Sequence, residues 1–457
     1  MARSTFPAHS HLHPVDRMTL SRRAWLGAAG ALAATAAWGS ASALAQQATP
    51  VASPVSAGRD WRQEHWVGSW FAPVHPPFAG AEGMEMFPSQ LIPLDAQTLR
   101  QIVRVSAGGD RARVRISNLY GVEPLTIGAA HLALRDAEAR IDPASDRTLT
   151  FSGSPAATIP PGAMVLSDPA DLLVPPLAEL AVSLYFPQPI ETTTVHGFGF
   201  QTNYISGEGD FTDAAELPVD STIQNWAFLT GIDVAVAAPT GVVVALGDSI
   251  TDGAFSTPDT NQRWPDLLAN RFAAEGPPFA VLNAGIGGNR LLGSEAGPMG
   301  LAFGENALAR FDRDVLAQPG VTHLIVFEGL NDILLPALFS EAVAPATPEA
   351  IIFALRQIIE RAHQHDIVVY GATLTPVAGW QGFTPEAEST RQVVNDWIRT
   401  SGAFDAVIDF DAIVRDPSNP TALLPAFDGG DHLHINDAGF HAMADGIDLA
   451  LFAAGSA

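Results

Sequence analysis

Four short stretches in the second half of the chain carry the residue types that acyl transfer requires. The first is GDS (247–249), which places a serine hydroxyl directly behind the apolar run GVVVAL. Together the four stretches supply a hydroxyl, backbone amides in glycine-rich segments, a carboxamide and an acid–imidazole pair. The other three are NAGIGG (283–288), GLND (329–332) and DHLH (431–434).

Each of these groups has a defined use in acyl transfer. A serine hydroxyl is a poor nucleophile until a neighbouring base takes its proton, and imidazole suits that task near neutral pH. A carboxylate on the other ring nitrogen fixes the tautomer and stabilises the imidazolium. The developing oxyanion needs preorganised donors, for which the amides of Ser249 and Gly288 and the side chain of Asn331 are candidates. Glycine at position 288 lets the backbone approach the substrate oxygen without a Cβ in the way.

The elements that must position these groups are predicted by the apolar runs from residue 240 onward. These runs are continuous rather than alternating, and helix-like stretches separate them, which predicts βαβ units and a parallel sheet covered on both faces. Ligands of such sheets bind at the carboxyl ends of the strands. The first three stretches follow apolar runs and the fourth precedes the final helix, so we expect all four at one sheet edge. The runs are VVVAL, FAVLNA, HLIVFEG, IVVYGATLTP and AVIDF.

Residues 61–237 have a different character. RARVRISNLYG (111–121) alternates polar and apolar residues, as a half-buried strand does. Proline pairs punctuate further strand candidates, and convincing helical periodicity is lacking. An antiparallel β-sandwich is therefore predicted ahead of the parallel-sheet domain. The further candidates are LTIGAAHLALRD, ELAVSLYFP and NWAFLTGIDVAV.

The four stretches, in this order, resemble the sequence blocks of the SGNH hydrolases, the GDSL esterase/lipase family. The resemblance spans nearly the whole of residues 238–457 and implies a flavodoxin-like three-layer α/β/α domain. It implies that Ser249 is the nucleophile, that Gly288 and Asn331 complete the oxyanion hole, and that His434 is the base with Asp431 as its partner. His432 also lies within DHLH, but Asp431 stands three positions before His434, as the family motif requires. No cofactor or metal is implied.

The substrate is less closely defined by the sequence. Members of the family cleave acetyl groups from sugars, fatty acyl chains from lysophospholipids, and other simple esters. An exported enzyme with a β-sandwich partner suggests an acetyl or short-chain ester, such as a small-molecule or glycan ester; a lysophospholipase or lipase activity is the alternative. We expect Asn289, Arg290 and Trp380, in loops at the same sheet edge, to line the pocket.

Other interpretations remain open beside this one. Ser249 and Asn331 could merely cap helices, and the protein could be a glycan-binding module whose serine site has decayed. A metal-dependent hydrolase is a further alternative, since five residues near the C-terminus have suitable side chains. No G-x-S-x-G elbow occurs, which argues against an α/β-hydrolase. The metal candidates are Asp431, His432, His434, Asp437 and His441.

The N-terminus predicts export. Arg22 and Arg23 precede an Ala/Gly-rich stretch that ends in Ala43-Leu44-Ala45, so residues 1–45 resemble a twin-arginine signal peptide. A Pro/Ser/Ala-rich linker is predicted over residues 46–60. We expect a periplasmic or extracellular protein without a membrane span after signal cleavage.

Composition also limits the partners. The chain has 24 basic residues against 49 acidic ones, so neither nucleic acid nor an anionic membrane surface is expected as a principal partner. It contains no cysteine, which excludes disulfides, thiolate metal sites and cysteine nucleophiles.

Overall fold

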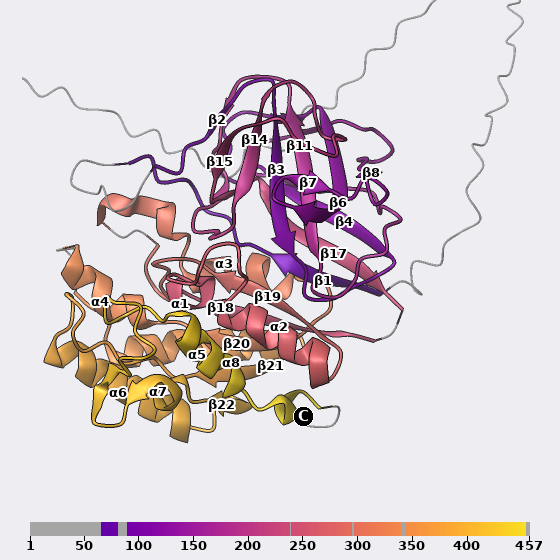
Figure 1. Ribbon diagram of the computed structural model, residues 1–457. Coiled ribbons are helices and arrows are strands. Elements are labelled where there is room, and N and C mark those ends of the chain that lie inside the picture. The colour runs from indigo at the N-terminus through magenta and orange to yellow at the C-terminus, as the bar shows by residue number, and fades with distance from the viewer. Residues whose placement is uncertain (1–64, 81–88, 238, 295–296, 340–343, 454–457) are drawn as a thin grey trace, which may run out of the picture. The chain divides into compact units, whose positions relative to one another are not determined.

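The computed structural model describes residues 65–80, 89–237, 239–294, 297–339 and 344–453 (Figure 1). The predicted signal peptide and linker, residues 1–60, lie outside the described residues. No helix in the described ranges is long and apolar enough to cross a membrane.

The C-terminal part is built on a five-stranded parallel sheet in the order β19-β18-β20-β21-β22. Numbered along the chain this is 2-1-3-4-5, the flavodoxin-like order, so the predicted α/β architecture is confirmed. All five predicted apolar runs form its strands. These are β18 (Gly241–Gly247), β19 (Phe279–Gly285), β20 (Val321–Phe327), β21 (Val368–Ala372) and β22 (Ala406–Ile408).

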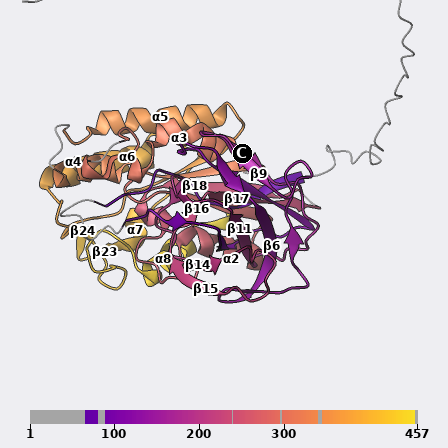
Figure 2. The same cartoon turned by 90° about the horizontal axis from the view of Figure 1, so that it is seen from above.

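Helices cover both faces of this sheet (Figure 2). On one side lie α3 (Ala307–Phe311), α5 (Pro348–His363) and α6 (Pro385–Thr400); on the other lie α2 (Trp264–Glu275), α7 (Phe410–Val414) and α8 (Asp437–Asp445). The sequence Thr-Pro-Glu-Ala starts both long helices. Thr347 and Thr384 accept hydrogen bonds from the amides of Ala350 and Ala387, and each is followed by a proline, which suits a first helical position.

The remaining short helices complete the C-terminal part. Between β19 and β20, α3 is followed directly by a π-helical turn, Asp312–Leu316. Two helices that carry functional residues, α1 and α4, begin immediately after β18 and β20. Their bounds are α1 (Ser249–Asp252) and α4 (Leu330–Leu338); 3₁₀ turns cover Gly297–Phe303 and Leu449–Phe452, and a short hairpin joins β23 (Arg415–Asp416) to β24 (Asn419–Leu423).

The N-terminal part consists of antiparallel strands, as predicted (Figure 1). One sheet has the order β1-β17-β4-β10 and the other β15-β14-β3-β11-β6-β7, with β8 paired to β6. Apolar side chains of both sheets meet in one core, which gives the expected sandwich-like arrangement. The strands are β1 (His65–Phe71), β3 (Gln97–Arg104), β4 (Arg111–Ser117), β6 (Ala129–Ala137), β7 (Arg140–Ile141), β8 (Arg147–Thr148), β10 (Met164–Leu166), β11 (Glu179–Phe186), β14 (Asn203–Glu208), β15 (Val219–Ile223) and β17 (Leu229–Val236); short pairs are β2 (Pro93–Leu94) with β12 (Ile190–Glu191), β5 (Leu125–Ile127) with β9 (Ala157–Ile159), and β13 (Val195–His196) with β16 (Trp226–Ala227).

Strand β4 differs from its predicted half-buried state, because six of its seven residues are buried. The polar side chains of its alternating pattern find partners inside the protein rather than water. Arg115 lies 3.2 Å from Asp233 of β17, and Arg113 bonds the same carboxylate at 2.9 Å while its guanidinium packs over the Trp66 ring. A charged face can be buried when each charge is paired, and alternation alone does not reveal this.

The antiparallel part packs directly on the parallel sheet. The amide of Val281, on edge strand β19, donates to Ser106 Oγ at 3.0 Å, and that hydroxyl donates to the Ser69 carbonyl at 2.7 Å. The amide of Gly68 donates to the carbonyl of Pro319 at 2.9 Å. Residues 60–457 form one compact unit, and the predicted division into domains at 61–237 and 238–457 stays a prediction.

Candidate active site

The functional stretches meet at the carboxyl edge of the parallel sheet. Ser249 is the first residue of α1 and follows β18 by one residue, and Asn331 lies in the first turn of α4 after β20. Gly288 belongs to the loop after β19, while Asp431 and His434 belong to the loop before α8. All five line one cavity. Strand order explains this convergence. The chain passes from β18 to β19 on one side and then to β20 on the other side of β18, and this reversal of strand order leaves a crevice at the carboxyl ends of the strands.

Ser249, His434 and Asp431 form a continuous hydrogen-bonded chain. Ser249 Oγ lies 2.9 Å from His434 Nε2, and His434 Nδ1 lies 2.6 Å from Asp431 Oδ2. The other oxygen of Asp431 accepts the amides of Leu433 and His434 at 3.0 and 2.8 Å. Burial raises the pKa of Asp431, but these hydrogen bonds outweigh it and hold the pKa at about 2. Asp431 therefore remains charged, Nδ1 carries the proton, and Nε2 is free to accept one from Ser249.

An aromatic ring supports the histidine from the side. Phe255 stacks on the His434 imidazole with ring centres 5.1 Å apart and planes 12° apart. Its backbone has φ of +71°, a left-handed conformation that a bulky residue keeps only where its surroundings hold it. The side chain is 49% exposed and also lines the cavity, so it shields one face of the base from water.

The three residues predicted to form an oxyanion hole, Ser249, Gly288 and Asn331, line the same cavity. Asp248 caps α1 by accepting the amide of Ile250 at 3.0 Å, which leaves the amide of Ser249 outside the cap. Gly288 has φ of +76°, and a Cβ there would lie 2.5 Å from the Phe303 ring. Asn331 Nδ2 donates to the carbonyl of Asn289 at 3.0 Å, while its contact with Asp248 is long, at 3.4 Å. A substrate oxygen would receive the second N–H in place of this long contact with Asp248.

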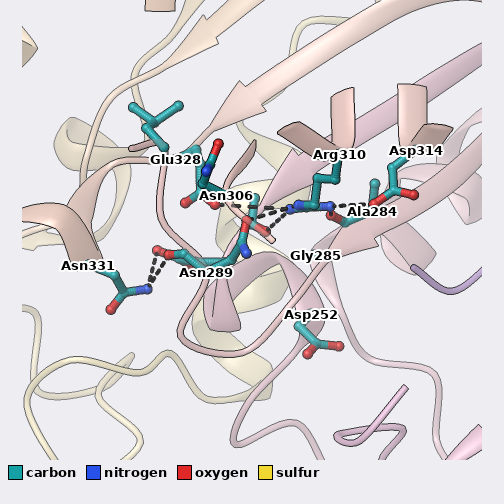
Figure 3. Close-up of polar contacts among 12 residues, drawn as sticks. Asp252, Ala284, Gly285, Asn289, Asn306, Arg310, Asp314, Glu328 and Asn331 are labelled. Carbon is teal, nitrogen blue, oxygen red and sulfur yellow. Dashed lines mark hydrogen bonds and ion pairs between the residues drawn. The ribbon is translucent and has the colours of Figure 1, made fainter. Parts of the chain in front are cut away.

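A buried arginine fixes the loop that carries Gly288 (Figure 3). Arg310 Nε donates to the side-chain oxygen of Asn289 at 2.9 Å, and Nη1 donates to the carbonyl of Ala284 at 2.8 Å. Nη2 donates to the carbonyl of Gly247, at the end of β18, at 3.1 Å. The carbonyl of Asn289 in turn accepts a hydrogen bond from Asn331, so one guanidinium links the ends of two strands to two residues of the predicted oxyanion hole.

Three buried acids lie behind the nucleophile. Burial raises the pKa of Asp248 and of Asp332 to about 6. Burial and the charge of Asp248 also raise the pKa of Glu328 well above its ordinary value, which Arg310, 4.0 Å away, only partly offsets. The two aspartates nearest the Ser249–His434 pair therefore differ in their pKa shifts. Burial raises the pKa of Asp248 and disfavours its charge, while hydrogen bonds lower the pKa of Asp431 and preserve its charge.

The cavity in front of the serine has a volume of about 540 Å³ and predominantly apolar walls. One wall consists of Phe303 with the α4 side chains Leu335 and Leu338 and the adjacent Phe339. Trp380 and Leu433 lie on other walls, and two aromatic residues of the antiparallel part complete the lining. These two are Phe198 and Phe200.

The pocket residues predicted from sequence differ in their placement. Trp380 lines the cavity, whereas Asn289 and Arg290 are not among its lining residues. Asn289 is buried and uses its amide to hold the carbonyls of Phe303 and Glu305, at 2.7 and 2.9 Å. Phe198 and Phe200 were not predicted to line the pocket, because they precede Ser249 by about 50 residues and belong to no motif of the C-terminal part.

The alternative metal ligands do not converge. His432 Nδ1 pairs with Asp428 at 2.6 Å, Asp437 accepts hydrogen bonds from Thr257, and His441 pairs with Gln262 at 2.7 Å. Within the described ranges the structure contains no group of three or more histidine and acidic side chains that could hold a metal ion. The remaining two candidates, Asp431 and His434, bond each other in the hydrogen-bonded chain that includes Ser249.

Replacement of Gly288 by alanine should lower kcat for ester hydrolysis by about 10²–10³, the usual cost of a lost oxyanion donor. The reason is that the new Cβ would collide with Phe303 and displace the amide. Gly153→Ala is the matched control, because Gly153 also has positive φ but nothing lies within 4 Å of its Cβ position. It should lose stability and keep wild-type kcat; an unchanged kcat in folded Gly288→Ala would contradict the assignment.

Glu328 should make the protein less stable as pH rises. Its folded-state pKa is raised, so the folded protein binds more protons than the unfolded one above the ordinary pKa of glutamate, and the free energy of unfolding falls with increasing pH. Glu328→Gln should therefore show a shallower fall in Tm between pH 5 and pH 8 than the wild type. The exposed Glu386→Gln serves as control and should follow the wild-type curve. Parallel curves for all three proteins would exclude this role of Glu328.

Comparison with known proteins agrees with this geometry. The GDSL-like lipase/acylhydrolase family model matches residues 245–442. No curated protein matches the sequence.

Similar solved structures include a lipase/acylhydrolase from Enterococcus faecalis (20% identity, 46% of this chain and 95% of that chain, TM-score 0.35). A GDSL-like lipase from Bacteroides thetaiotaomicron VPI-5482 has 19% identity over 46% of this chain and 87% of that chain, with a TM-score of 0.34. The acetyl xylan esterase AlAXEase has 19% identity over 45% of this chain and 96% of that chain, with a TM-score of 0.33. Residues 245–442 of this chain thus form a domain of the GDSL-like lipase/acylhydrolase family, as their motifs predicted.

Proposed function

We propose that the protein is an exported serine esterase that works through an acyl-enzyme intermediate formed on Ser249. The observation that carries this proposal is the chain from Ser249 Oγ through His434 to Asp431, with both distances in hydrogen-bonding range. Export is supported by the paired arginines at 22–23 and the Ala43-Leu44-Ala45 sequence alone.

The first half of the reaction forms the acyl-enzyme. Ser249 Oγ attacks the ester carbonyl carbon while its proton passes to His434 Nε2. The electron pair of the C=O bond moves to the oxygen, which receives hydrogen bonds from the amides of Ser249 and Gly288 and from Asn331. When the tetrahedral intermediate collapses, the C–O bond to the alcohol breaks and His434 gives its proton to the departing oxygen.

Water completes the cycle by the same route. His434 takes a proton from water as the water oxygen attacks the acyl carbon. The second tetrahedral intermediate then breaks the bond to Ser249 Oγ, and His434 returns the proton to the serine. Asp431 stays ionised throughout and stabilises the imidazolium in both halves, which its low pKa permits.

The cavity favours esters with a substantial apolar group. Its volume of about 540 Å³ far exceeds what an acetyl group fills, and five phenylalanine and three leucine residues are among those that line it. Each buried CH₂ contributes about 0.8 kcal/mol, so a medium-length acyl chain gains more from these walls than acetate does. The acetylated carbohydrate expected from the sequence remains the other candidate, for which Trp380 offers a stacking surface.

Ser249 should be the only serine labelled by a fluorophosphonate probe, as located by mass spectrometry, because only this hydroxyl is bonded to the free nitrogen of His434. Ser249→Ala should abolish both labelling and hydrolysis of p-nitrophenyl butyrate. Ser154→Ala, at an exposed turn of the antiparallel part, is the control and should retain both. Substantial hydrolysis by folded Ser249→Ala would refute the mechanism.

Octanoyl esters should be cleaved with a kcat/KM at least about tenfold above acetyl esters of the same alcohol, because the longer chain buries more apolar surface. Leu338→Trp, which narrows the cavity from α4, should lower the octanoate-to-acetate ratio. Acetylated xylan and lysophospholipid complete the substrate set. Equal or better cleavage of acetate, together with deacetylation of xylan, would favour the carbohydrate ester instead.

A further inference from the structure

A histidine of the antiparallel part reaches into the catalytic part behind the oxyanion hole. His196, the last residue of β13, is buried, and its Nε2 lies 2.8 Å from Asp252 Oδ1. Its Nδ1 lies 2.9 Å from the carbonyl of Pro73. Both side chains of the His196–Asp252 pair are nearly inaccessible to solvent, with 4% and 3% exposure. Asp252 ends helix α1, three residues after the nucleophile.

The second oxygen of Asp252 holds the glycine loop. Asp252 Oδ2 accepts the amide of Gly287 at 2.9 Å, and Gly287 directly precedes the oxyanion donor Gly288. Because successive peptide units share a Cα, the direction of the Gly288 N–H depends on where the Gly287 amide is held. The hydrogen bonds therefore run from His196 through Asp252 to the peptide next to the oxyanion hole.

The orientation of His196 is fixed from both ends. One ring nitrogen faces the carbonyl of Pro73 and the other faces the carboxyl group of Asp252, so both are within hydrogen-bonding distance of an oxygen. The Trp226 ring packs against the imidazole with centres 5.6 Å apart. An unpaired buried carboxylate at Asp252 would be costly, which ties the position of Asp252 to the presence of His196.

A neighbouring residue of the same segment touches the same loop. A Cβ on Gly287 would lie 2.8 Å from the Phe198 ring, so Phe198 packs directly against this glycine. Phe198 also lines the cavity beside Gly287 and Gly288. The segment from His196 to Phe198 thus holds the glycine loop by a charge-assisted hydrogen bond on one side and by an aromatic face on the other.

We propose that His196 is a positioning residue for the oxyanion hole, acting through Asp252 on the Gly287–Gly288 loop, so that the antiparallel part completes the active site. The expected fall in kcat rests on the proposed serine mechanism, whereas the expected support of the Gly287–Gly288 loop by His196 does not. Loss of the contact should weaken binding of the transition state and leave the ground-state cavity intact, which lowers kcat and not KM.

Two substitutions separate the two bonds of His196. In His196→Asn the side-chain amide takes the place of Nδ1, so the contact with Pro73 can persist and that with Asp252 is lost. In His196→Gln the amide reaches the place of Nε2 and can still donate to Asp252. We expect kcat for p-nitrophenyl butyrate to fall roughly 10- to 100-fold in His196→Asn with KM within about twofold, and to remain near wild type in His196→Gln.

Hydrogen exchange of the peptide that contains residues 283–290 supplies a readout independent of catalysis. The Gly287 amide should exchange faster in His196→Asn than in the wild type and in His196→Gln, because its acceptor is no longer held. His131→Gln is the matched control: it removes the Nδ1 contact of another histidine–aspartate pair of the antiparallel part, His131–Asp146 at 2.8 Å. It should change neither kcat nor this exchange.

The outcomes distinguish the inference from the proposed function. A wild-type protein without fluorophosphonate labelling at Ser249 would refute the serine mechanism, while the exchange comparison would still test the positioning role. Unchanged exchange in folded His196→Asn would overturn the inference, whatever the activity. Equal kcat losses in His196→Asn, His196→Gln and His131→Gln would also overturn it, since they would indicate general destabilisation.

Discussion

The geometry of the site depends on the hydrogen bonds that the buried guanidinium of Arg310 donates. The guanidinium is fully buried and donates to the end of β18 at Gly247, to the end of β19 at Ala284 and to the side chain of Asn289. These three acceptors fix the nucleophile strand, the glycine-loop strand and the backbone that orients Asn331. A fully buried cation is unfavourable unless it is paired and hydrogen-bonded, and Asp314, 3.3 Å from Nη1, supplies the opposite charge.

The electrostatics around Ser249 follow from the same burial. Asp248 lies next to the serine in sequence, but burial raises its pKa to about 6 and its oxygen is already used as a helix cap. Asp431 lies far away in sequence, yet two backbone amides and His434 hold its pKa at about 2. The carboxylate that pairs with the histidine is therefore Asp431, three residues before His434, whereas Asp248, the sequence neighbour of Ser249, is buried and caps a helix.

The antiparallel part has a direct share in the site. It contributes Phe198 and Phe200 to the cavity wall and His196 to the support of Asp252. It also fixes the loop after α1, where Asp259 accepts hydrogen bonds from Gln201 and Thr202 at 2.6 to 2.7 Å. That loop also carries Phe255, which stacks on His434.

Much of this protein could be predicted from its sequence. Continuous apolar runs separated by helical stretches determined the parallel sheet, and the polar stretches at their ends determined the candidates Ser249, Gly288, Asn331, Asp431 and His434. These signals are local: a buried strand must be apolar, and a group at the strand end must be polar to act there. The boundaries of the short helices were harder to predict from the sequence. The burial of β4 was not predicted, because paired charges can replace apolar side chains inside a fold.

Only the tertiary structure decided which distant residues share the site. Asn289, predicted to line the pocket, instead bonds Arg310 and supports Asn331, while Phe198, Phe200 and His196 come from a part of the chain that carries no catalytic motif. The sequence by itself determined the chemistry of the site, because the types of the side chains at the strand ends are visible in it. It did not determine which residues form the cavity walls or support the site. Those residues depend on how one sheet packs on another, and no local sequence pattern predicts that contact.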